Sequence, residues 1–368
     1  MIVIKKLVKA IFIVCLLVGC GVKTYASELN FSVSPEIPEN QQDKNKSYYD
    51  LKLEPGNKQE LKVVLKNGTD KEVEIETSVS RATTNLKGVV EYGKTKDKKD
   101  ESLVYNIEDF VEIPENNVKI PPNESKELTI KVEAPEKTFE GIMAGGLTFK
   151  EVTKEEKVDE KNTGLAIKNE YAYVVGLVLH GENEDMPSEV NLIHVEAAQV
   201  NARNVINGTL QNPKAKYLNQ VAVNATVTKE GSKEVLYETK QDTMQMAPNS
   251  NFQFPISLDG EPLKPGKYTL NMDVSSLTDS WKLTKNFTIE KEVADKFNAK
   301  DVSIQEDHTM TYLSIGLGTL LIIGVIIYFI YRHKKKERMR KERLRRERIR
   351  RKNKARKREK QKNNLKKS

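Results

Sequence analysis

Apolar and polar residues alternate in short segments throughout residues 58–289, and this alternation constrains the fold more than any other feature of the sequence. In residues 58–66, for example, Leu61, Val63 and Leu65 alternate with polar neighbours. Because successive side chains of a strand point to opposite faces, each segment is predicted to be an antiparallel strand with one buried and one solvated face. Turn-forming Pro, Gly and Asn residues separate the segments, with no long amphipathic helix among them. The pattern therefore predicts an all-β fold built from sandwiches.

The alternating region is long enough for two domains, since about 285 residues lie between the two terminal segments and a domain takes roughly 100–200 residues. One unit also occurs twice. Residues 118–141 and 246–268 each contain an apolar residue, a Pro-Asn turn, an alternating strand and a turn into a further strand. We therefore predict two tandem immunoglobulin-like antiparallel β-sandwiches at 28–183 and 189–293, a long exposed hairpin loop at 151–169 and a stalk at 294–311.

An uncharged, mostly apolar segment at 312–331 is followed directly by a strongly basic segment at 332–368. Twenty residues at 1.5 Å each form a helix of about 30 Å, which matches the hydrocarbon core of a bilayer. The basic segment has 22 Lys and Arg residues against four Glu, and such a one-sided excess marks the cytoplasmic side of a span. The sequence predicts a single-pass type I protein with residues 27–311 outside and a helical cytoplasmic tail. The residues placed at the membrane surfaces, where the basic ones meet anionic lipid, are Tyr312, Tyr331, Arg332, Lys334, Lys335 and Lys336.

Residues 1–26 have the features of a secretory signal peptide, because lysines precede an apolar run and small residues follow it. Cleavage after Ala26 is expected. The alternative is that Cys20, in a lipoprotein-like Leu-Val-Gly-Cys sequence, is acylated and becomes the mature N-terminus. Both cysteines of the chain lie in this leader. After cleavage at Ala26 no disulfide is possible, so the exterior domains must be stabilised by their cores.

The net charge of +8 is unevenly distributed along the chain. The leader and the segment at 332–368 together hold more positive charge than this total, so residues 27–331 are net negative. A basic isoelectric point is therefore no evidence for nucleic-acid binding, and none is predicted.

Several segments resemble the WxL-interacting protein family. Those similar to its first domain are residues 29–41, 48–55, 141–149 and 171–179, and those similar to its second are 201–219, 244–251 and 263–270. The order of signal peptide, two β domains, span and basic tail is similar as well. The resemblance implies a surface complex of a Gram-positive bacterium, with residues 27–311 at the cell wall. The implied partners are peptidoglycan for the first domain, a host or partner protein for the second, and a WxL-domain protein.

The mature chain is poor in the groups that catalysis requires. Two of its four histidines, His180 and His194, lie on predicted strands and could form a metal site with carboxylates, but ordinary strand positions are favoured. The sequence lacks an HExxH helix, a GxSxG elbow and a glycine-rich phosphate loop. In the glycine-containing segment 141–146, which we expect between strands, small residues favour a close backbone approach or a bulge. We predict no enzyme activity, no cofactor and no metal.

Aromatic and amide side chains are the candidate contact residues. Trp281 is the single tryptophan, and it is either a core residue or an interface anchor. Tyrosines can stack on sugar rings, although they also fill strand faces; the candidates for wall binding are Tyr48, Tyr49, Tyr171 and Tyr173. Asparagines near residue 205 favour a network of structural turns, with polar contacts to a partner as the alternative. The candidates for partner binding are Arg203, Asn204, Asn207, Asn212 and Trp281.

These predictions combine into a non-enzymatic, membrane-anchored scaffold that binds a WxL-type secreted protein and peptidoglycan at the cell surface. Two alternatives remain open. One is a cell-wall hydrolase with a carboxylate pair in a cleft, for which Glu72/Glu74/Glu76 and Glu108/Asp109 are examples of neighbouring acidic residues. The other is an adhesin or receptor that signals through the basic tail, which would require a folded or motif-bearing cytoplasmic domain.

Overall fold

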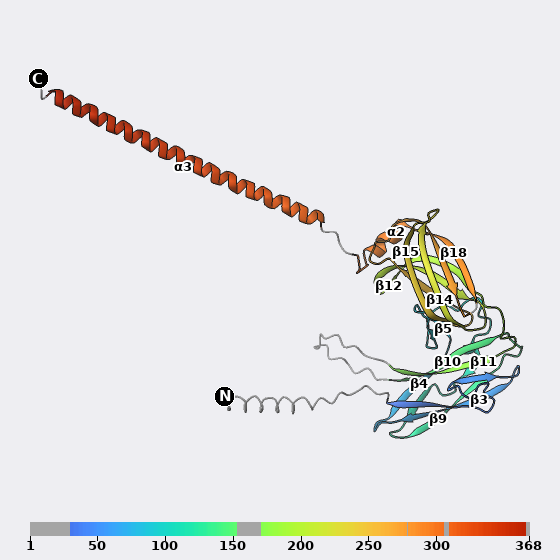
Figure 1. The fold of residues 1–368 in the computed structure, drawn as a ribbon. Coiled ribbons are helices and arrows are strands. Elements are labelled where there is room, and N and C mark those ends of the chain that lie inside the picture. The colour runs from blue at the N-terminus through green and yellow to red at the C-terminus, as the bar shows by residue number, and fades with distance from the viewer. Residues whose placement is uncertain (1–29, 153–170, 278, 305–308, 366–368) are drawn as a thin grey trace, which may run out of the picture. The chain divides into compact units, whose positions relative to one another are not determined.

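The computed structural model describes residues 30–152, 171–277, 279–304 and 309–365 (Figure 1). The expected signal peptide, both cysteines and all but the first two residues of the expected loop at 151–169 lie outside these ranges. The chain forms two units, which divide after Ser303. The first unit contains the β-strands, and the second contains the C-terminal helix.

Two sheets form the first sandwich. One has the strand order β1-β3-β9-β7 and the other the order β2-β11-β10-β4-β8, in which β2 is parallel to β11 and the other pairs are antiparallel. A small hairpin, β5-β6, follows β4, and a 3-10 helix, η1, precedes β7. The bounds are β1 (Phe31–Glu36), β2 (Tyr49–Lys52), β3 (Lys58–Asn67), β4 (Val73–Arg81), β5 (Thr83–Thr84), β6 (Val90–Glu91), η1 (Ile107–Asp109), β7 (Val111–Glu112), β8 (Asn117–Ile120), β9 (Ser125–Glu133), β10 (Ile142–Glu151) and β11 (Ala172–His180).

The core of the first sandwich follows from the alternation in the sequence. Leu61, Val63 and Leu65 on β3 are at most 1% exposed, as their period of two predicts. They form one cluster with residues of the facing sheet, among them Ile75 and Phe149. Burial of each such side chain stabilises the fold by about 1.5–3 kcal/mol. The segment at 58–66 is thus confirmed as a strand with one buried face.

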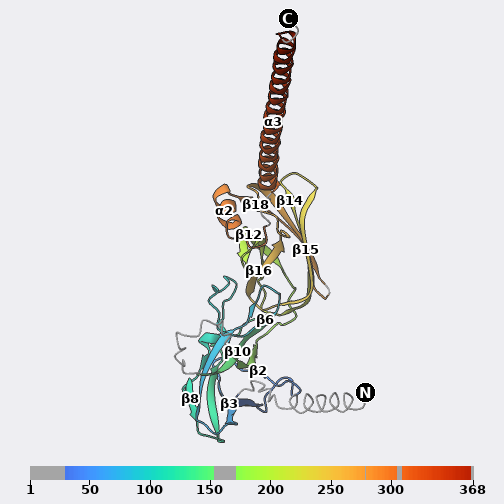
Figure 2. The ribbon, with the colours of Figure 1, turned by 90° about the vertical axis from the view of Figure 1, so that its left-hand side faces the viewer.

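The second sandwich also has two antiparallel sheets, with the strand orders β12-β13-β16 and β15-β14-β17-β18 (Figures 1 and 2). They enclose a separate core in which Ile206, Phe254 and Leu270 are fully buried. The predicted fold class, all-β with two tandem immunoglobulin-like sandwiches, is confirmed. The bounds are β12 (Asn191–Val200), β13 (Arg203–Asn212), β14 (Leu218–Lys229), β15 (Val235–Met246), β16 (Ser250–Ser257), β17 (Gly266–Ser275) and β18 (Ser280–Ile289).

Both sandwiches use the same asparagine-centred turn, in which an asparagine outside the repeated segments binds the start of each repeat. The side-chain amide of Asn67 donates to the backbone carbonyl oxygens of residues 71 and 121, at 2.6 and 3.0 Å. In the second sandwich Asn212 donates to those of residues 216 and 247, at 2.7 and 2.9 Å. The Pro-Asn turns also match, because Asn123 and Asn249 have φ values of 58° and 45°. Asparagine tolerates this left-handed region better than most residues do.

Two segments differ from the sequence-based expectations. The alternation in residues 233–239 predicts a strand of that length, but β15 continues to Met246 because β14 offers it backbone partners along most of its length. The segment at 141–146 is not between strands, since Gly145 and Gly146 lie inside β10. A Cβ atom on Gly146 would lie 2.5 Å from the Cβ of Tyr92. These glycines thus permit a close approach of another segment, which is one of the two explanations that the sequence suggests.

A short helix, α2 (Lys291–Asn298), packs on the second sandwich where the sequence suggests a stalk. Ala294 is fully buried and Phe297 contacts the second core. Asn298 and the backbone of Leu263 exchange two hydrogen bonds, of 2.8 and 2.9 Å. The first residues of the expected stalk are therefore part of the second sandwich, because their apolar side chains have a core to enter.

Residues 82–106 of the first sandwich contact the second. Thr84 Oγ1 accepts a hydrogen bond from the backbone N–H of Ala247 at 2.9 Å. The carbonyl oxygen of Gly88 accepts one from the backbone N–H of Gln245 at 2.7 Å. These hydrogen bonds give backbone groups of the second sandwich partners in the first.

The second unit is one continuous helix, α3 (Thr309–Leu365). From Tyr312 onward it is long and apolar enough to cross a membrane. The predicted span and the predicted helical tail are thus parts of a single helix, with Tyr331, Arg332 and Lys334 to Lys336 at the transition between them.

Candidate functional site

The asparagines predicted to contact a partner are buried. Asn212 is fully buried in its turn, whereas Asn204 and Asn207 are 3% and 2% exposed. The side-chain amide of Asn204 donates to Asn298 Oδ1 at 2.9 Å, which ties β13 to the end of α2. Of this group only Arg203 is exposed. The geometry therefore gives the asparagines the structural role that the sequence favours.

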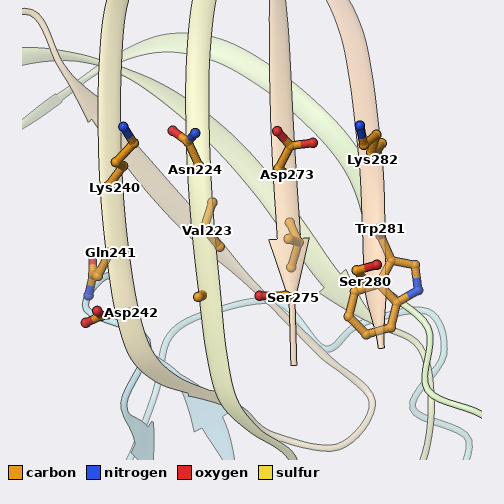
Figure 3. A pocket seen from close by; sticks show the side chains of 12 residues that line it. Val223, Asn224, Lys240, Gln241, Asp242, Asp273, Ser275, Ser280, Trp281 and Lys282 are labelled. Atoms are coloured by element: carbon orange, nitrogen blue, oxygen red, sulfur yellow. The ribbon is translucent and has the colours of Figure 1, made fainter. Parts of the chain in front are cut away.

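A groove of about 500 Å³ crosses the outer face of the sheet β15-β14-β17-β18 (Figure 3). Its centre is a row of four side chains, one from each strand, namely Lys240, Asn224, Asp273 and Lys282. The row faces outward because the neighbouring Val223 is buried in the core. Since adjacent strands are about 4.8 Å apart, the row is about 14 Å long. We call this feature the outer-face groove.

Trp281 lies at the β18 end of the outer-face groove (Figure 3). Its partly buried indole packs against the second core, and in register it stands opposite the buried Val274. Its side chain is therefore on the core side of β18, opposite the outward row. This placement supports the core role, and its partial burial agrees with the position of β18 at the end of the sheet.

The central side chains of the groove have few partners within the protein. Asn224 Oδ1 is buried and has no hydrogen-bond partner in the part of the chain that the structure describes. Asp273 and Lys282 make no side-chain hydrogen bond or ion pair within these same residues, although they stand opposite each other. Lys240 is paired with Glu238 at 2.8 Å. The groove therefore offers polar groups that a ligand can satisfy.

The four tyrosines proposed for wall binding do not form one surface. Tyr49 is fully buried, and its hydroxyl donates to a backbone carbonyl oxygen of β3 at 2.7 Å. Tyr173 packs edge-to-face on Phe31, with ring centroids 5.3 Å apart. Tyr171 is 45% exposed and Tyr48 is partly buried. Tyr49 is thus excluded from a contact at the surface, whereas Tyr171 is exposed and Tyr48 and Tyr173 are partly exposed.

A tyrosine cluster that sequence reasoning missed lies beside Tyr48. The hydroxyls of Tyr92 and Tyr217, one from each sandwich, are hydrogen bonded at 3.0 Å, and burial raises the pKa of the Tyr217 hydroxyl. Tyr92 and Tyr48 lie over Gly146 and Gly176, which pair with each other on β10 and β11. The two glycines are a sequence signal for a close approach by another segment. The sequence does not show which residues approach, because the tyrosines come from distant segments.

His180 belongs to a partly buried polar cluster around Asp50. The carboxylate of Asp50, 2% exposed, contacts His180 Nε2 at 2.6 Å and Lys46 Nζ at 2.9 Å. His180 Nδ1 lies 2.9 Å from Glu184. Burial alone would raise the pKa of Asp50, but the hydrogen bonds with His180 and Lys46 hold it below its ordinary value. His194 is not in this cluster, and among the described residues no group of His, Cys, Asp and Glu could hold a metal ion.

The carboxylates of Glu76 and Glu108, both considered for hydrolysis, interact with different basic residues of the protein. Glu76 pairs with Lys94 at 2.6 Å on the solvated face of β4. Glu108 accepts a hydrogen bond from the backbone N–H of Arg81 at 2.9 Å and lies 3.5 Å from its guanidinium. Such contacts are typical of structural carboxylates.

A comparison with solved structures finds matches of low identity and low TM-score. The chaperone–tip adhesin complex of CFA/I fimbriae is 10% identical, covering 71% of this chain and 98% of that chain, with a TM-score of 0.26. The E. coli chaperone DraB is 13% identical, covering 71% and 98%, with a TM-score of 0.24. A PapD-like domain of human CEP192 is 12% identical, covering 44% and 93%, with a TM-score of 0.25. These likenesses concern the fold alone.

Two family models match the sequence over most of its length. The peptidoglycan binding domain of the WxL Interacting Protein matches residues 31–151, and its host binding domain matches residues 162–299. The second match begins before β11, although β11 pairs with β10 in the first sandwich. A search of curated proteins finds no significant match. The chain belongs to the WxL-interacting protein family.

Proposed function

We propose that this protein is a non-enzymatic, membrane-anchored scaffold that binds peptidoglycan and a WxL-type secreted protein at the cell surface, with a host protein as a further ligand. The observation that carries the proposal is the match of the chain to a peptidoglycan-binding and a host-binding domain in tandem. A cell-surface binding role follows from the family itself. The WxL-type partner follows from the family's name.

We assign wall binding to the first sandwich, residues 28–183, and protein binding to the second, residues 189–293. On the first, Tyr171 is exposed, and Tyr48 and Tyr173 are partly exposed. On the second, Arg203 and the outer-face groove beside Trp281 are accessible. Binding surfaces of this kind need no catalytic group, which agrees with the separate engagement of the carboxylates.

Membrane anchoring by α3 supports the scaffold role. Its apolar part suits a bilayer, and its basic part, from Arg332, would be held at the cytoplasmic face by anionic lipid, at about 1 kcal/mol per basic residue near the surface. In this arrangement residues 27–311 are outside the membrane at the wall. Protease added to intact cells should digest these residues and spare the tail. Cleavage of the tail from outside would show the opposite orientation.

A binding experiment tests the proposed partners. The full-length protein in detergent is mixed with purified peptidoglycan sacculi and, separately, with a purified WxL-domain protein. We expect the protein to sediment with sacculi and to co-elute with the WxL-domain protein. Failure of the second assay with an intact first would remove the WxL partner from the proposal and leave wall binding in place.

A further inference from the structure

A cavity of about 410 Å³ lies at the junction of the two sandwiches, and segments of both line it. The first sandwich supplies residues from 102–105 and 138–143, and the second supplies residues 213–215 and Asn249. Met186, from the connection between the sandwiches, completes the lining. Binding sites occur preferentially where two domains meet. We call this feature the junction pocket.

Hydrogen bonds between the sandwiches hold the walls of the junction pocket together. The side-chain amide of Asn249 donates to the backbone carbonyl oxygens of Ser102 and Pro213, at 3.0 and 2.9 Å. The backbone N–H of Ile142 donates to the carbonyl oxygen of Ala215 at 2.8 Å. All five residues line the pocket. The folded chain itself therefore positions the walls, and no ligand is needed to form them.

The apolar part of the lining joins buried side chains to a strongly exposed one. Met143 and Met186 are 4% and 9% exposed. The rings of Tyr105 and Phe139 have centroids 5.9 Å apart, and both residues are partly buried. Val104 is 81% exposed, more than any other large apolar side chain among the described residues. Methionine adapts its shape to an apolar partner, and covering the valine would be favourable.

Polar groups from both sandwiches complete the lining. Thr138 and Glu140 are exposed residues of the first sandwich, and Lys214 of the second is paired with Glu189 at 2.9 Å. A hydroxyl, a carboxylate and an ammonium group can form hydrogen bonds with the N–H and C=O groups of a peptide. A lipid acyl chain would remove these groups from water without offering them partners. The mixed lining therefore favours a protein segment.

We propose that the junction pocket receives the Trp and Leu side chains of the WxL-type partner. In an extended segment, side chains two residues apart, as in Trp-x-Leu, point to the same side and are about 7 Å apart. A volume at the lower end of the range for small-molecule sites suits two such side chains. Tryptophan is also common among the residues that dominate protein interfaces. This inference rests on the proposed WxL-type partner, and it adds the first sandwich to a protein contact that the proposed function assigns to the second.

A sheet edge is the competing place for an extended segment, because a free edge offers main-chain hydrogen bonds. Within the described residues β18 is such an edge, since it pairs with β17 alone. It carries Lys282 and Lys285, and lysines on an edge strand oppose the addition of another strand. The junction pocket instead offers a concave surface to apolar side chains.

Two variants of exposed lining residues test the site. The full-length protein in detergent is titrated with a purified WxL-domain protein. Val104→Asp brings a charge to the apolar lining and Thr138→Trp fills the cavity, so each should weaken binding by about tenfold or more. Val302→Asp is the matched control, because Val302 is 71% exposed and does not line the pocket. All three variants should keep the wild-type melting temperature and still sediment with peptidoglycan sacculi, since the changed residues are exposed.

The partner supplies the other half of the test. Replacing the Trp of its Trp-x-Leu sequence by Ala should weaken binding to the wild type by a similar factor, with little further effect on Val104→Asp, because both changes remove one contact. If the wild type does not bind the partner, the proposed partner and this site fall together. If the wild type binds but both pocket variants bind equally well, or the effects of the two changes add, the site is wrong and the partner stands. If the pocket variants lose binding of palmitate and keep the partner, the pocket takes a lipid instead.

Discussion

The carboxylate of Asp100, in the first sandwich, accepts a hydrogen bond of 2.9 Å from the side-chain amide of Gln211, in the second. Asn251 donates to the other carboxylate oxygen at 2.5 Å, and Asp100 is 8% exposed. Burial alone would raise the pKa of Asp100, but hydrogen bonds from Asn251, Ser102 and Gln211 hold it below its ordinary value. An ionised carboxylate in the first sandwich thus organises polar side chains of the second.

Replacing Asp100 by Asn should lower the free energy of unfolding by about 1.5–3 kcal/mol at neutral pH, because an amide cannot accept all of these hydrogen bonds. The folded-state pKa is below the ordinary value of 3.8, so the carboxylate's contribution is present above that value and is lost as the pH falls through the folded-state pKa. The difference in the free energy of unfolding between wild type and Asp100→Asn, measured by urea denaturation, should be constant above about pH 5 and shrink below about pH 4. The exposed Asp97 is the control, since Asp97→Asn should be neutral. A difference that grows on acidification would contradict this account.

The two buried asparagines of the second sandwich should differ in their effect on stability. Asn212→Ala removes amide hydrogen bonds to two backbone carbonyl oxygens, so a loss of about 2–3 kcal/mol is expected. Asn207 makes one side-chain bond, to Gln253 at 3.0 Å, and its Oδ1 has no partner among the described residues. Asn207→Ala should therefore cost only about 1 kcal/mol. Equal costs, measured by denaturant titration, would show that the turn around Asn212 has no special role.

Gly88 and Gly56 form a matched pair for testing the contact between the sandwiches. Both have positive φ, 68° and 72°, so alanine at either position costs about 1–2 kcal/mol of backbone strain. A Cβ on Gly88 would also lie 2.4 Å from the side chain of Met244, whereas nothing lies within 4 Å at Gly56. Gly88→Ala should be the more destabilising by about 1–3 kcal/mol in thermal or urea unfolding. If Met244 is the cause, Gly88→Ala and Met244→Ala together should cost less than the sum of the two.

The partial burial of Trp281 predicts an intermediate cost of truncation. Phe254 is fully buried, and Phe254→Ala should cost about 3–5 kcal/mol. Trp281 is only partly buried against the same core, so Trp281→Ala should cost about half as much. Unfolding has to be followed by circular dichroism, because Trp281→Ala removes the fluorophore. A cost equal to that of Phe254→Ala would make Trp281 a core residue alone.

Local patterns were sufficient to predict the sandwiches. The alternation of Leu61, Val63 and Leu65 reflects contacts that any strand with one buried face must make, so it is visible in nine residues. The repeated Pro-Asn turns were also visible in the sequence, within residues 118–141 and 246–268. The asparagines that bind these segments, Asn67 and Asn212, lie outside the repeat and were identified only in the structure. The continuation of β15 to Met246 could not be predicted from local patterns, because its length is set by pairing with β14 and not by its own composition.

The candidate sites were harder to predict because they depend on residues far apart in the chain. Tyr92 and Tyr217 are 125 residues apart, and Asp100 and Gln211 are 111 apart, so no spacing links them. The groove joins four strands, and its row exists only once their register is fixed. The alternating sequence around Trp281 predicts a strand, but it does not show whether that strand has a neighbouring strand or solvent on each side.

Binding to the wall without turnover tests the central claim most directly. The full-length protein in detergent is incubated with insoluble peptidoglycan, the sediment is assayed for protein, and the supernatant is assayed for released sugars and peptides. The account predicts that the protein sediments with the peptidoglycan and that nothing is released. Release of soluble fragments that a single Glu or Asp substitution abolishes would show an enzyme instead, and a protein that stays in the supernatant would contradict the scaffold.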